Sequence, residues 1–274
     1  SVELAQSAGW RVVTIEPEDF SFGRSLNYGC EAASGDLIVV MSAHVYPVRT
    51  DFIEKITAPF LGDDQLKIAY GKQVGDARSR FSEKVLMSQW FPSERVADQG
   101  HAFANNANSC FPRAIWQRLR FDEELSGLED IEFALRVMDL GGSVSYVPDA
   151  PVVHVHEETM AGIFNRYRRE ANAYKAMFPG EQMRLPQALG LWKKNVLRDL
   201  AQAHDERLLW NELASVLTFR SAQFAGAWQG FRDGLPQESA LLRRIYSPPA
   251  RSQAREETVS NLMIDYSVGD CVEV

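Results

Sequence analysis

Three of the five histidines in the chain follow segments that are predicted to be β-strands. His44 stands three residues after the apolar run Leu37–Met41, and His154 and His156 follow the extended segment 150–153. Alternation along an extended backbone places His154 and His156 on one face, and open α/β sheets bind ligands at the carboxyl ends of their strands. Because imidazole is a common metal ligand, we predict a divalent-metal site here. A structural role for His44, and a metal-dependent hydrolase built around His154 and His156, remain alternatives.

Two adjacent carboxylates, Glu129 and Asp130, open a predicted helix over residues 127–140. The helix dipole favours acidic residues in a first turn, and this accounts for one of the two. The loop 125–127 presents them after an Asn-rich polar stretch, residues 105–109, which we predict to line a site or form a turn. A carboxylate in such a place can act as a general base that deprotonates a hydroxyl acceptor.

The composition describes a folded protein without a nucleic-acid-binding character. The 274 residues are 45% apolar and 24% charged, and the net charge of -8 argues against a basic footprint for nucleic acid. Three scattered cysteines provide neither a disulfide framework nor a cysteine-based zinc site, which favours a reducing, cytoplasmic location. No apolar run approaches the length of about 18 residues that a membrane-spanning helix needs.

The order of predicted elements favours a doubly wound α/β fold. A helix over residues 1–8 precedes a strand, Trp10–Ile15, and a helix over 24–34 precedes the strand Leu37–Met41, whose continuous apolar run is typical of a strand buried on both faces of a mainly parallel sheet. The pattern then predicts helices over 50–60, 112–119, 127–140 and 160–178, and strands over 66–70, 144–147 and 152–155. Residues 188–232 are predicted to be helical and amphipathic, and the last 40 or so residues to form a loosely ordered tail.

The order of these motifs resembles that of the family-2 glycosyltransferases, and within them bacterial enzymes of the rhamnosyltransferase-like kind. The segments 22–29 and 33–40 resemble the family's donor-contacting segment and the strand that leads to its metal motif. Ser42-Ala43-His44 stands where the family has Asp-x-Asp, as in a subset of bacterial members. Glu129-Asp130 resembles the family's catalytic Glu-Asp pair, and the segment 153–156 resembles the stretch in which a His completes the metal shell.

This resemblance implies the GT-A fold, a Rossmann-like mixed sheet flanked by helices, followed by a C-terminal helical extension. We expect a catalytic domain over residues 1–180, an amphipathic extension over 181–235 and a tail over 236–274. The family normally begins with a βαβ unit that holds the nucleotide base. The first residues resemble the second helix of the fold instead, and no initiator Met precedes Ser1, so we expect the sequence to be a fragment.

The resemblance also implies the roles of the site residues. Asp130 is expected to be the general base of an inverting transfer, assisted by Glu129, with Mn²⁺ or Mg²⁺ held by His44 and one of His154 and His156. The residues expected to contact the nucleotide-sugar donor are Arg24, Asn27, Ser42, Asn106, Arg166 and Arg169. The processive members' Gln-x-x-Arg-Trp motif is missing from the sequence, which favours transfer of single sugars.

The expected acceptor is a glycan or a lipid-linked glycan of polysaccharide biosynthesis in the bacterial cell envelope. The amphipathic helices over 188–232 would then lie on the inner face of the cell membrane, unless they pack on the catalytic domain or on a second subunit. A non-catalytic module that keeps the glycosyltransferase fold is the competing reading. The sequence alone leaves the oligomeric state open.

Overall fold

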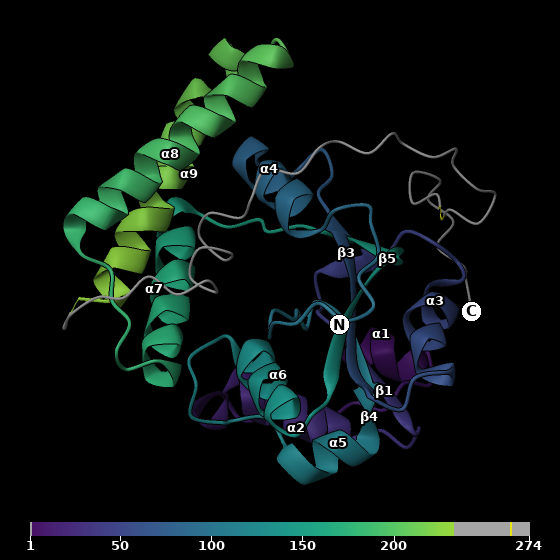
Figure 1. Ribbon diagram of the computed structural model, residues 1–274. Helices are drawn as coiled ribbons and strands as arrows, with labels where there is room; N and C mark the ends of the chain where they lie inside the picture. Colours follow the sequence, from purple (N-terminus) through teal and green to yellow (C-terminus); the bar gives the residue numbers. More distant parts are fainter. Residues whose placement is uncertain (1, 233–263, 265–274) are drawn as a thin grey trace.

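A computed structural model describes residues 2–232 and 264, and it shows a mixed sheet flanked by helices (Figure 1). The strands are β1 (Leu37–Met41), β2 (Val45–Pro47), β3 (Leu66–Val74), β4 (Asn108–Pro112) and β5 (Ser143–His154). The α-helices are α1 (Val2–Ser7), α2 (Phe22–Ala32), α3 (Phe52–Thr57), α4 (Phe81–Trp90), α5 (Arg113–Leu119), α6 (Glu129–Asp139), α7 (Met160–Met177), α8 (Leu185–Asp205) and α9 (Leu209–Gly230), with short 3-10 helices at Pro17–Asp19 and Ala58–Leu61.

The five strands lie in the order β1-β4-β3-β5-β2. Strand β3 pairs in parallel with β5, whereas the β1–β4, β3–β4 and β2–β5 pairs are antiparallel. The predicted α/β class is therefore confirmed, but the expectation of a mainly parallel sheet is wrong. Strand β1 is an edge strand of this sheet, and of its five residues only Ile38 is fully buried. Its apolar run thus does not mark a strand buried on both faces.

These pairings give β1, β3 and β5 the same direction, so their carboxyl ends meet at one edge of the sheet. His154 is the last residue of β5, and the segments that follow β1 and β5 bring His44 and His156 to the same edge. β1 does not pair with β3 or β5, but the rule that ligands bind at the carboxyl ends of strands depends only on the direction of the strands. The position predicted for the site is therefore the one at which the sheet places these residues.

The core lies on both faces of the sheet because successive side chains of a strand point to opposite sides. On one face Phe52 and Ile56 of α3 pack against Ala69 and Val152. On the other face the larger core includes Tyr70, Phe111, Phe133 and Tyr146, together with side chains of α4, α6 and α7. Alternation along β3, with Ala69 on the first face and Tyr70 on the second, fixes which helices cover which side.

Three local predictions are corrected by the structure. Residues 10–15 are extended but form no strand within the described part of the chain, and Trp10 is 71% exposed. The Asn-rich stretch 105–109 forms a turn at residues 106 and 107, as predicted, but it then enters β4, where buried Asn108 donates to the carbonyls of Lys72 and Ala150, at 3.1 and 3.2 Å. Residues 144–147 and 152–155 belong mostly to one strand, β5, whose register on β3 shifts where Pro148 removes a backbone donor.

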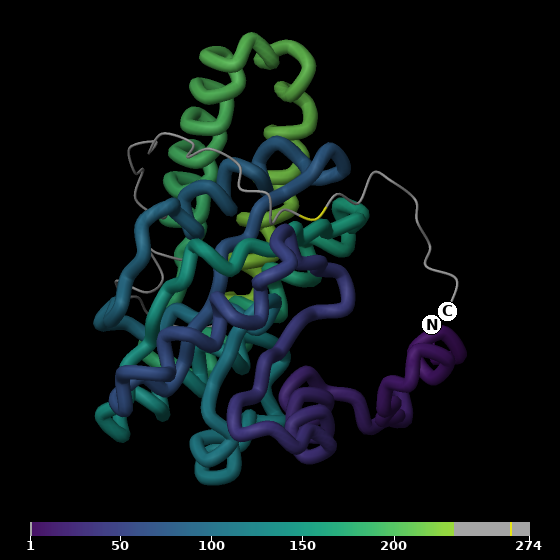
Figure 2. The backbone as a smooth tube through the Cα atoms, turned by 90° about the vertical axis from the view of Figure 1, so that its right-hand side faces the viewer, coloured from purple at the N-terminus to yellow at the C-terminus, as the bar shows by residue number. Residues whose placement is uncertain are grey.

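The helical extension forms an antiparallel hairpin, α8–α9, that stands on the part of the chain with the sheet and packs on α4 and α7 (Figures 1 and 2). A fully buried ion pair fixes it: the Arg220 guanidinium donates to both oxygens of Asp199, at 2.7 and 2.9 Å. Ser82 of α4 donates a third hydrogen bond to the Asp199 carboxylate, at 2.6 Å. The expectation that residues 188–232 are mostly helical is confirmed, and the hairpin packs on the part of the chain that contains the sheet, which is one of the three positions considered.

The amino-terminal helix contributes little to this arrangement. Helix α1 buries none of its side chains and projects from the body (Figure 2). The expected tail, 236–274, lies outside the described residues apart from Ile264, whose amide donates to the carbonyl of Val48 at 2.7 Å. Among the described helices, none has the length and hydropathy needed to cross a membrane.

Close approach of α9 to α7 depends on Gly226. A Cβ atom at this position would lie 2.2 Å from the carbonyl oxygen of Phe164. We expect Gly226→Ala to lower the free energy of unfolding by about 1–3 kcal/mol, since the rigid backbone of α7 has to move. Gly190→Ala is the matched control, because its Cβ would meet nothing within 4 Å and alanine favours a helix interior by about 1 kcal/mol. Urea unfolding measures both, and equal effects would contradict this account of the packing.

Candidate active site

The pairing of β2 with β5 brings the three histidines together. In this pair Val45 lies opposite His154, and the Val155 amide donates to the His44 carbonyl at 3.4 Å. His44 therefore stands beside His154, although the two are 110 positions apart in the chain. Alternation then puts His156 on the same face as His154.

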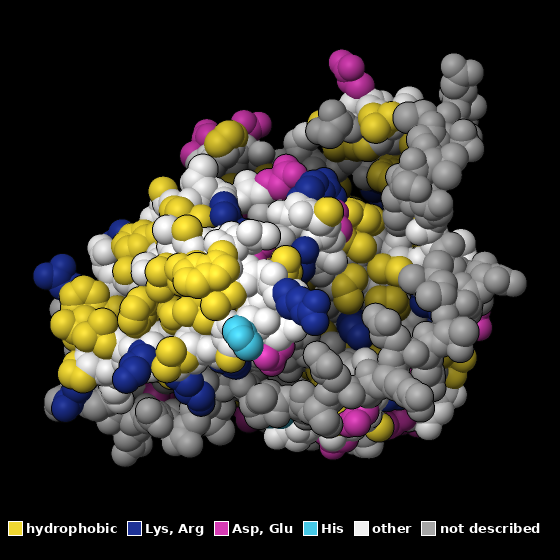
Figure 3. All heavy atoms as spheres, turned by 90° about the horizontal axis from the view of Figure 1, so that it is seen from above, with side chains coloured by type: hydrophobic (Ala, Val, Ile, Leu, Met, Phe, Trp, Pro, Cys, Tyr) yellow, Lys and Arg dark blue, Asp and Glu magenta, His cyan; other side chains and the backbone are white. Residues whose placement is uncertain are grey.

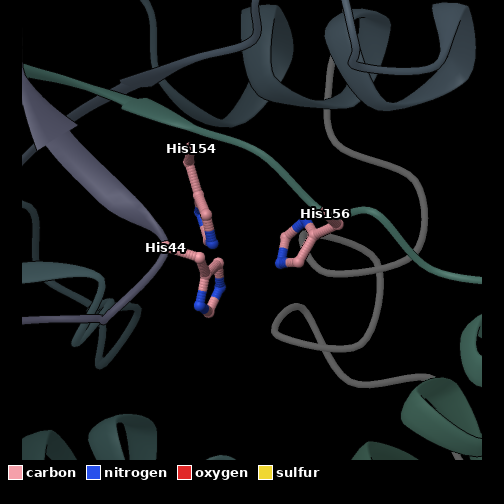
Figure 4. A group of neighbouring side chains, drawn as sticks. All are labelled: His44, His154 and His156. Atoms are coloured by element: carbon pink, nitrogen blue, oxygen red, sulfur yellow. The ribbon is translucent and has the colours of Figure 1, made fainter. Parts of the chain in front are cut away.

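The three imidazoles surround one small space (Figure 4). The ring centroids are 4.7 Å apart for His44 and His154, 5.3 Å for His44 and His156, and 4.1 Å for His154 and His156. One nitrogen from each ring lies within 4.8 Å of the other two. Ligand nitrogens about 2.1 Å from one ion lie about 3 to 3.5 Å apart, so small side-chain rotations bring all three onto a single metal.

The hydrogen bonding of His154 fits a metal ligand. Its Nδ1 lies 2.6 Å from Oε1 of Gln73, which can only accept, so Nδ1 carries the proton. The Nε2 atom therefore has a free lone pair, and it is buried without a hydrogen-bond partner. A buried nitrogen without a partner costs free energy unless something binds it. An ion between the three rings satisfies that nitrogen.

Behind His156 lies a group of charged side chains. Oε1 of the buried Glu83 is 3.6 Å from Nδ1 of His156 and accepts a hydrogen bond from Arg166 at 3.2 Å. The Nε atom of Arg166 is 2.8 Å from a carboxylate oxygen of Glu158. The predicted donor contact Arg166 thus lies directly beside the histidine cluster, in an ion-pair network of two carboxylates.

Burial keeps these imidazoles neutral. It lowers the pKa of His154 to about 3 and that of His156 to about 2, with further lowering by the neighbouring Arg166. Burial also lowers the pKa of the more exposed His44. Neutral imidazole is the form that binds metals, so the cluster presents ligand-competent rings at neutral pH. An open groove of about 460 Å³, lined by His44, His156 and Glu158 among others, gives access to it.

The acid pair stands at the amino end of α6. Leu128, the residue before it, is in the left-handed region with φ of 59°, a conformation that costs a non-glycine residue about 1 kcal/mol. One oxygen of Asp130 accepts the Asn106 amide hydrogen at 3.1 Å and the other accepts that of Ile131 at 2.8 Å. The carboxylate is thereby held in a fixed orientation. Strained backbone of this kind is concentrated at functional sites.

Helix α7 connects the acid pair with the histidine cluster. Arg166 contacts the network behind the histidines, and Glu170, one helical turn further on, interacts electrostatically with Asp130. The Ser126 hydroxyl donates to the Arg169 carbonyl at 3.0 Å and so fixes the acid loop on α7. Burial raises the pKa of Glu170 to about 7, and it also raises the pKa values of the adjacent Glu129 and Asp130.

The remaining predicted donor contacts are dispersed over the molecule. Asn27 is saturated: its amide donates to the Phe121 carbonyl and to Glu123, and its oxygen accepts from Trp116 and from the Phe121 amide. The Asn27 side chain therefore has no hydrogen-bonding capacity left for a donor. Arg24 is paired with Glu123 at 2.8 Å.

Ser42, Asn106 and Arg169 lie nearer to the two clusters. Ser42 forms the turn between β1 and His44, and its amide donates to the Ala107 carbonyl at 3.2 Å. Asn106 is held beside Asp130, and its side-chain nitrogen is buried without a partner. Arg169 lies over the Phe22 ring, with 5.5 Å between its guanidinium carbon and the ring centroid.

A family model described as "Glycosyltransferase like family 2" matches residues 3–173, which is more than half of the chain. The chain belongs to this family. The family-2 assignment is thus confirmed, whereas the rhamnosyltransferase-like subgroup is not tested by the match.

Solved structures agree with this fold. The mannosyltransferase PcManGT from Pyrobaculum calidifontis, solved with GDP-Man and Mn²⁺, is similar with a TM-score of 0.53 at 16% identity, covering 82% of this chain and 71% of that one. Glucosyl-3-phosphoglycerate synthase from Mycobacterium tuberculosis gives a TM-score of 0.45 at 16% identity, over 65% and 66% of the two chains. No curated protein matches the sequence. The family match and the similarity to the mannosyltransferase confirm the GT-A fold.

Three residues of the site were not predicted from the sequence: Gln73, Glu83 and Glu170. Gln73 lies in β3 without any motif around it, and its partner His154 lies on another strand. Glu83 reads as an ordinary N-terminal helix carboxylate and does form a capping box. Glu170 sits in a run of charged residues on α7 that is indistinguishable in sequence from a solvated helix face.

The raised pKa of Glu170 predicts a stability that falls with pH. Since the folded chain holds this proton more tightly than the unfolded chain does, the stabilisation is complete below pH 4.5, the usual value, and is lost as pH rises to about 7. Glu170→Gln, which stays neutral, should reduce the loss of stability between about pH 5 and about pH 7.5. Urea unfolding at both pH values measures it, with the exposed Glu124→Gln as control. An unchanged pH dependence in Glu170→Gln would contradict the assignment.

Proposed function

We propose that this chain is the catalytic part of an inverting glycosyltransferase that moves a sugar from a nucleotide-diphosphate donor to a hydroxyl of a glycan or lipid-linked acceptor. The observation that carries the proposal is the placement of two chemically different clusters along one side of α7. Arg166 belongs to the surroundings of the histidines, and Glu170 to those of the acid pair. A leaving diphosphate and an attacking hydroxyl need these two kinds of group on opposite sides of one sugar.

In this proposal His44, His154 and His156 hold a divalent ion. When bound, the ion offsets the negative charge that develops on the departing diphosphate, a contribution of several kcal/mol in such reactions. Arg166 adds a fixed positive charge beside the groove, and its ion pairs with Glu83 and Glu158 hold the guanidinium in place. The buried rings keep their orientation before the donor arrives, so little reorganisation is needed during the reaction.

Asp130 is the proposed general base. The acceptor oxygen forms a bond to the anomeric carbon while the bond from that carbon to the diphosphate oxygen breaks, and Asp130 takes the hydroxyl proton. The hydrogen bonds from the amides of Asn106 and Ile131 hold the carboxylate for this step. Burial raises the pKa of Asp130, and a base whose pKa is closer to the working pH is a better proton acceptor.

The choice of donor and of acceptor is part of the proposal. The similar mannosyltransferase is described with GDP-Man and Mn²⁺, which supports a nucleotide-sugar donor and a divalent metal here. Rhamnose follows from the sequence resemblance, as do the bacterial cell envelope and the inner face of the membrane as the place of action. Arg24, Ser42, Asn106 and Arg169 are proposed contacts of donor or acceptor.

The surface of the hairpin fits contact with a membrane that carries the acceptor. Exposed apolar side chains along α8 and at the start of α9 include Leu185, Leu189, Leu197 and Trp210, the last with 83% of its surface exposed. Figure 3 shows the molecule from above, the side toward which the hairpin projects. Hydrophobic side chains gather on this face among Lys and Arg side chains. Apolar groups flanked by cations are suited to anionic lipid surfaces.

Replacing Asp130 separates an enzyme from a non-catalytic module with the same fold. We expect Asp130→Asn to lower turnover about 10²–10⁴-fold, because the amide cannot accept the proton, and to leave the circular dichroism spectrum unchanged. The measurement is release of nucleoside diphosphate from UDP-, dTDP- and GDP-sugars. The matched control is Glu124→Gln, an exposed carboxylate just before the acid loop. Equal release by the variant and the unmodified chain would favour the non-catalytic module.

A further inference from the structure

The metal site consists of imidazoles alone. Within the described part of the chain, the group whose ligand atoms converge contains His44, His154 and His156 and no carboxylate. We infer that this site selects a late first-row transition ion, such as Co²⁺, Ni²⁺ or Zn²⁺, and does not hold Mg²⁺. The inference deepens the proposed function and rests on it, and it narrows the Mn²⁺ or Mg²⁺ expected from the family resemblance.

Ligand chemistry provides the first reason. Mg²⁺ is a hard ion that prefers carboxylate and water oxygens in an octahedral shell. Imidazole nitrogen suits the borderline ions, whose affinity rises from Mn²⁺ through Co²⁺ to Ni²⁺. Three neutral rings also bring no negative charge with which to draw Mg²⁺ out of its hydration shell. The same three rings give a borderline ion a set of ligands on one side and leave its other positions open.

The carboxylates near the cluster do not supply the missing oxygen ligand. Glu158 lies 2.8 Å from Arg166, and Glu83 accepts from the same guanidinium at 3.2 Å, so Arg166 engages both carboxylates. Glu83 faces Nδ1 of His156, 3.6 Å away, which leaves Nε2 of that ring for an ion. Glu83 thus stands behind the His156 ring, whereas Glu158 lines the groove and is held by its ion pair with Arg166.

Gln73 supports the same conclusion as a positioning residue. Its Oε1 accepts the Nδ1 hydrogen of His154 at 2.6 Å, and this fixes the ring with Nε2 toward the other two imidazoles. The unpartnered, buried Nε2 then has a lone pair in one direction only. A carboxylate in the place of Gln73 would make the His154 ring more basic and would add negative charge to the site. The neutral Gln73 amide fixes the ring without either effect.

Metal binding to the full chain, without donor or acceptor, tests the inference. After treatment with EDTA, Co²⁺, Zn²⁺, Mn²⁺ and Mg²⁺ are titrated separately by calorimetry, and Co²⁺ is followed also by its visible absorption. We expect one Co²⁺ or Zn²⁺ per chain, bound at least about 100-fold more tightly than Mg²⁺. Gln73→Leu should weaken Co²⁺ binding by about 10–100-fold while the chain stays folded.

A reciprocal substitution makes the test sharper. His44 is exposed, so His44→Asp can introduce a carboxylate without disturbing the core. This variant should lose affinity for Co²⁺ and gain measurable affinity for Mg²⁺. The exposed His204, on α8, provides the control His204→Asp, which should leave both affinities unchanged.

Three results would overturn the inference: Mg²⁺ binding as tightly as Co²⁺, no binding of any of the ions to the folded chain, or a His44→Asp variant with unchanged selectivity. Failure of this inference is distinguishable from failure of the proposed function. If Mg²⁺ is preferred while Asp130→Asn abolishes sugar transfer, only the metal assignment is wrong. If Co²⁺ is preferred but no donor is turned over, only the transferase proposal is wrong.

Discussion

The pairing of Val45 with His154 is the constraint on which the rest of the candidate site depends. It joins the turn after β1 to the end of β5, and it thereby places His44 beside two histidines from a distant part of the chain. Backbone hydrogen bonds fix this register, and a slip by one residue would turn His154 to the opposite face of the sheet. The pairing of strands thus sets the arrangement of the three histidines, and the helices only enclose the site.

Helix α7 extends this arrangement from a metal site to a reaction site. Arg166 and Glu170 lie one helical turn apart on α7. Arg166 belongs to the ion pairs beside the histidines, and Glu170 interacts with Asp130 of the acid pair. The α8–α9 hairpin packs closely on α7 at Gly226, and the buried pair of Arg220 with Asp199 holds the two helices of the hairpin together. An extension that is remote from the chemistry therefore contributes to its geometry.

How much the sequence could predict follows from the range of the interactions involved. The rule for strand ends needs only local patterns, and it located His44 and His154 before any pairing was known, whereas Glu129-Asp130 was found from its place at the start of a predicted helix. The inference that β1 is buried on both faces was wrong, because an apolar run says nothing about which strands lie beside it. Gln73 and Glu170 act through partners on other elements, so neither pattern nor spacing identifies them. Asn27 resembled a ligand contact because saturation by Trp116 and Phe121 is visible only in three dimensions.

The central claim is that the histidine cluster, through its ion, holds the diphosphate of the donor. Calorimetric titration of UDP, dTDP and GDP into the full chain tests it most directly, with Co²⁺ or Mn²⁺ present or with EDTA, and again on His154→Ala. The account predicts that one nucleotide binds only in the presence of metal and that His154→Ala abolishes this binding. Binding that is equally tight in EDTA, or unchanged in His154→Ala, would contradict it.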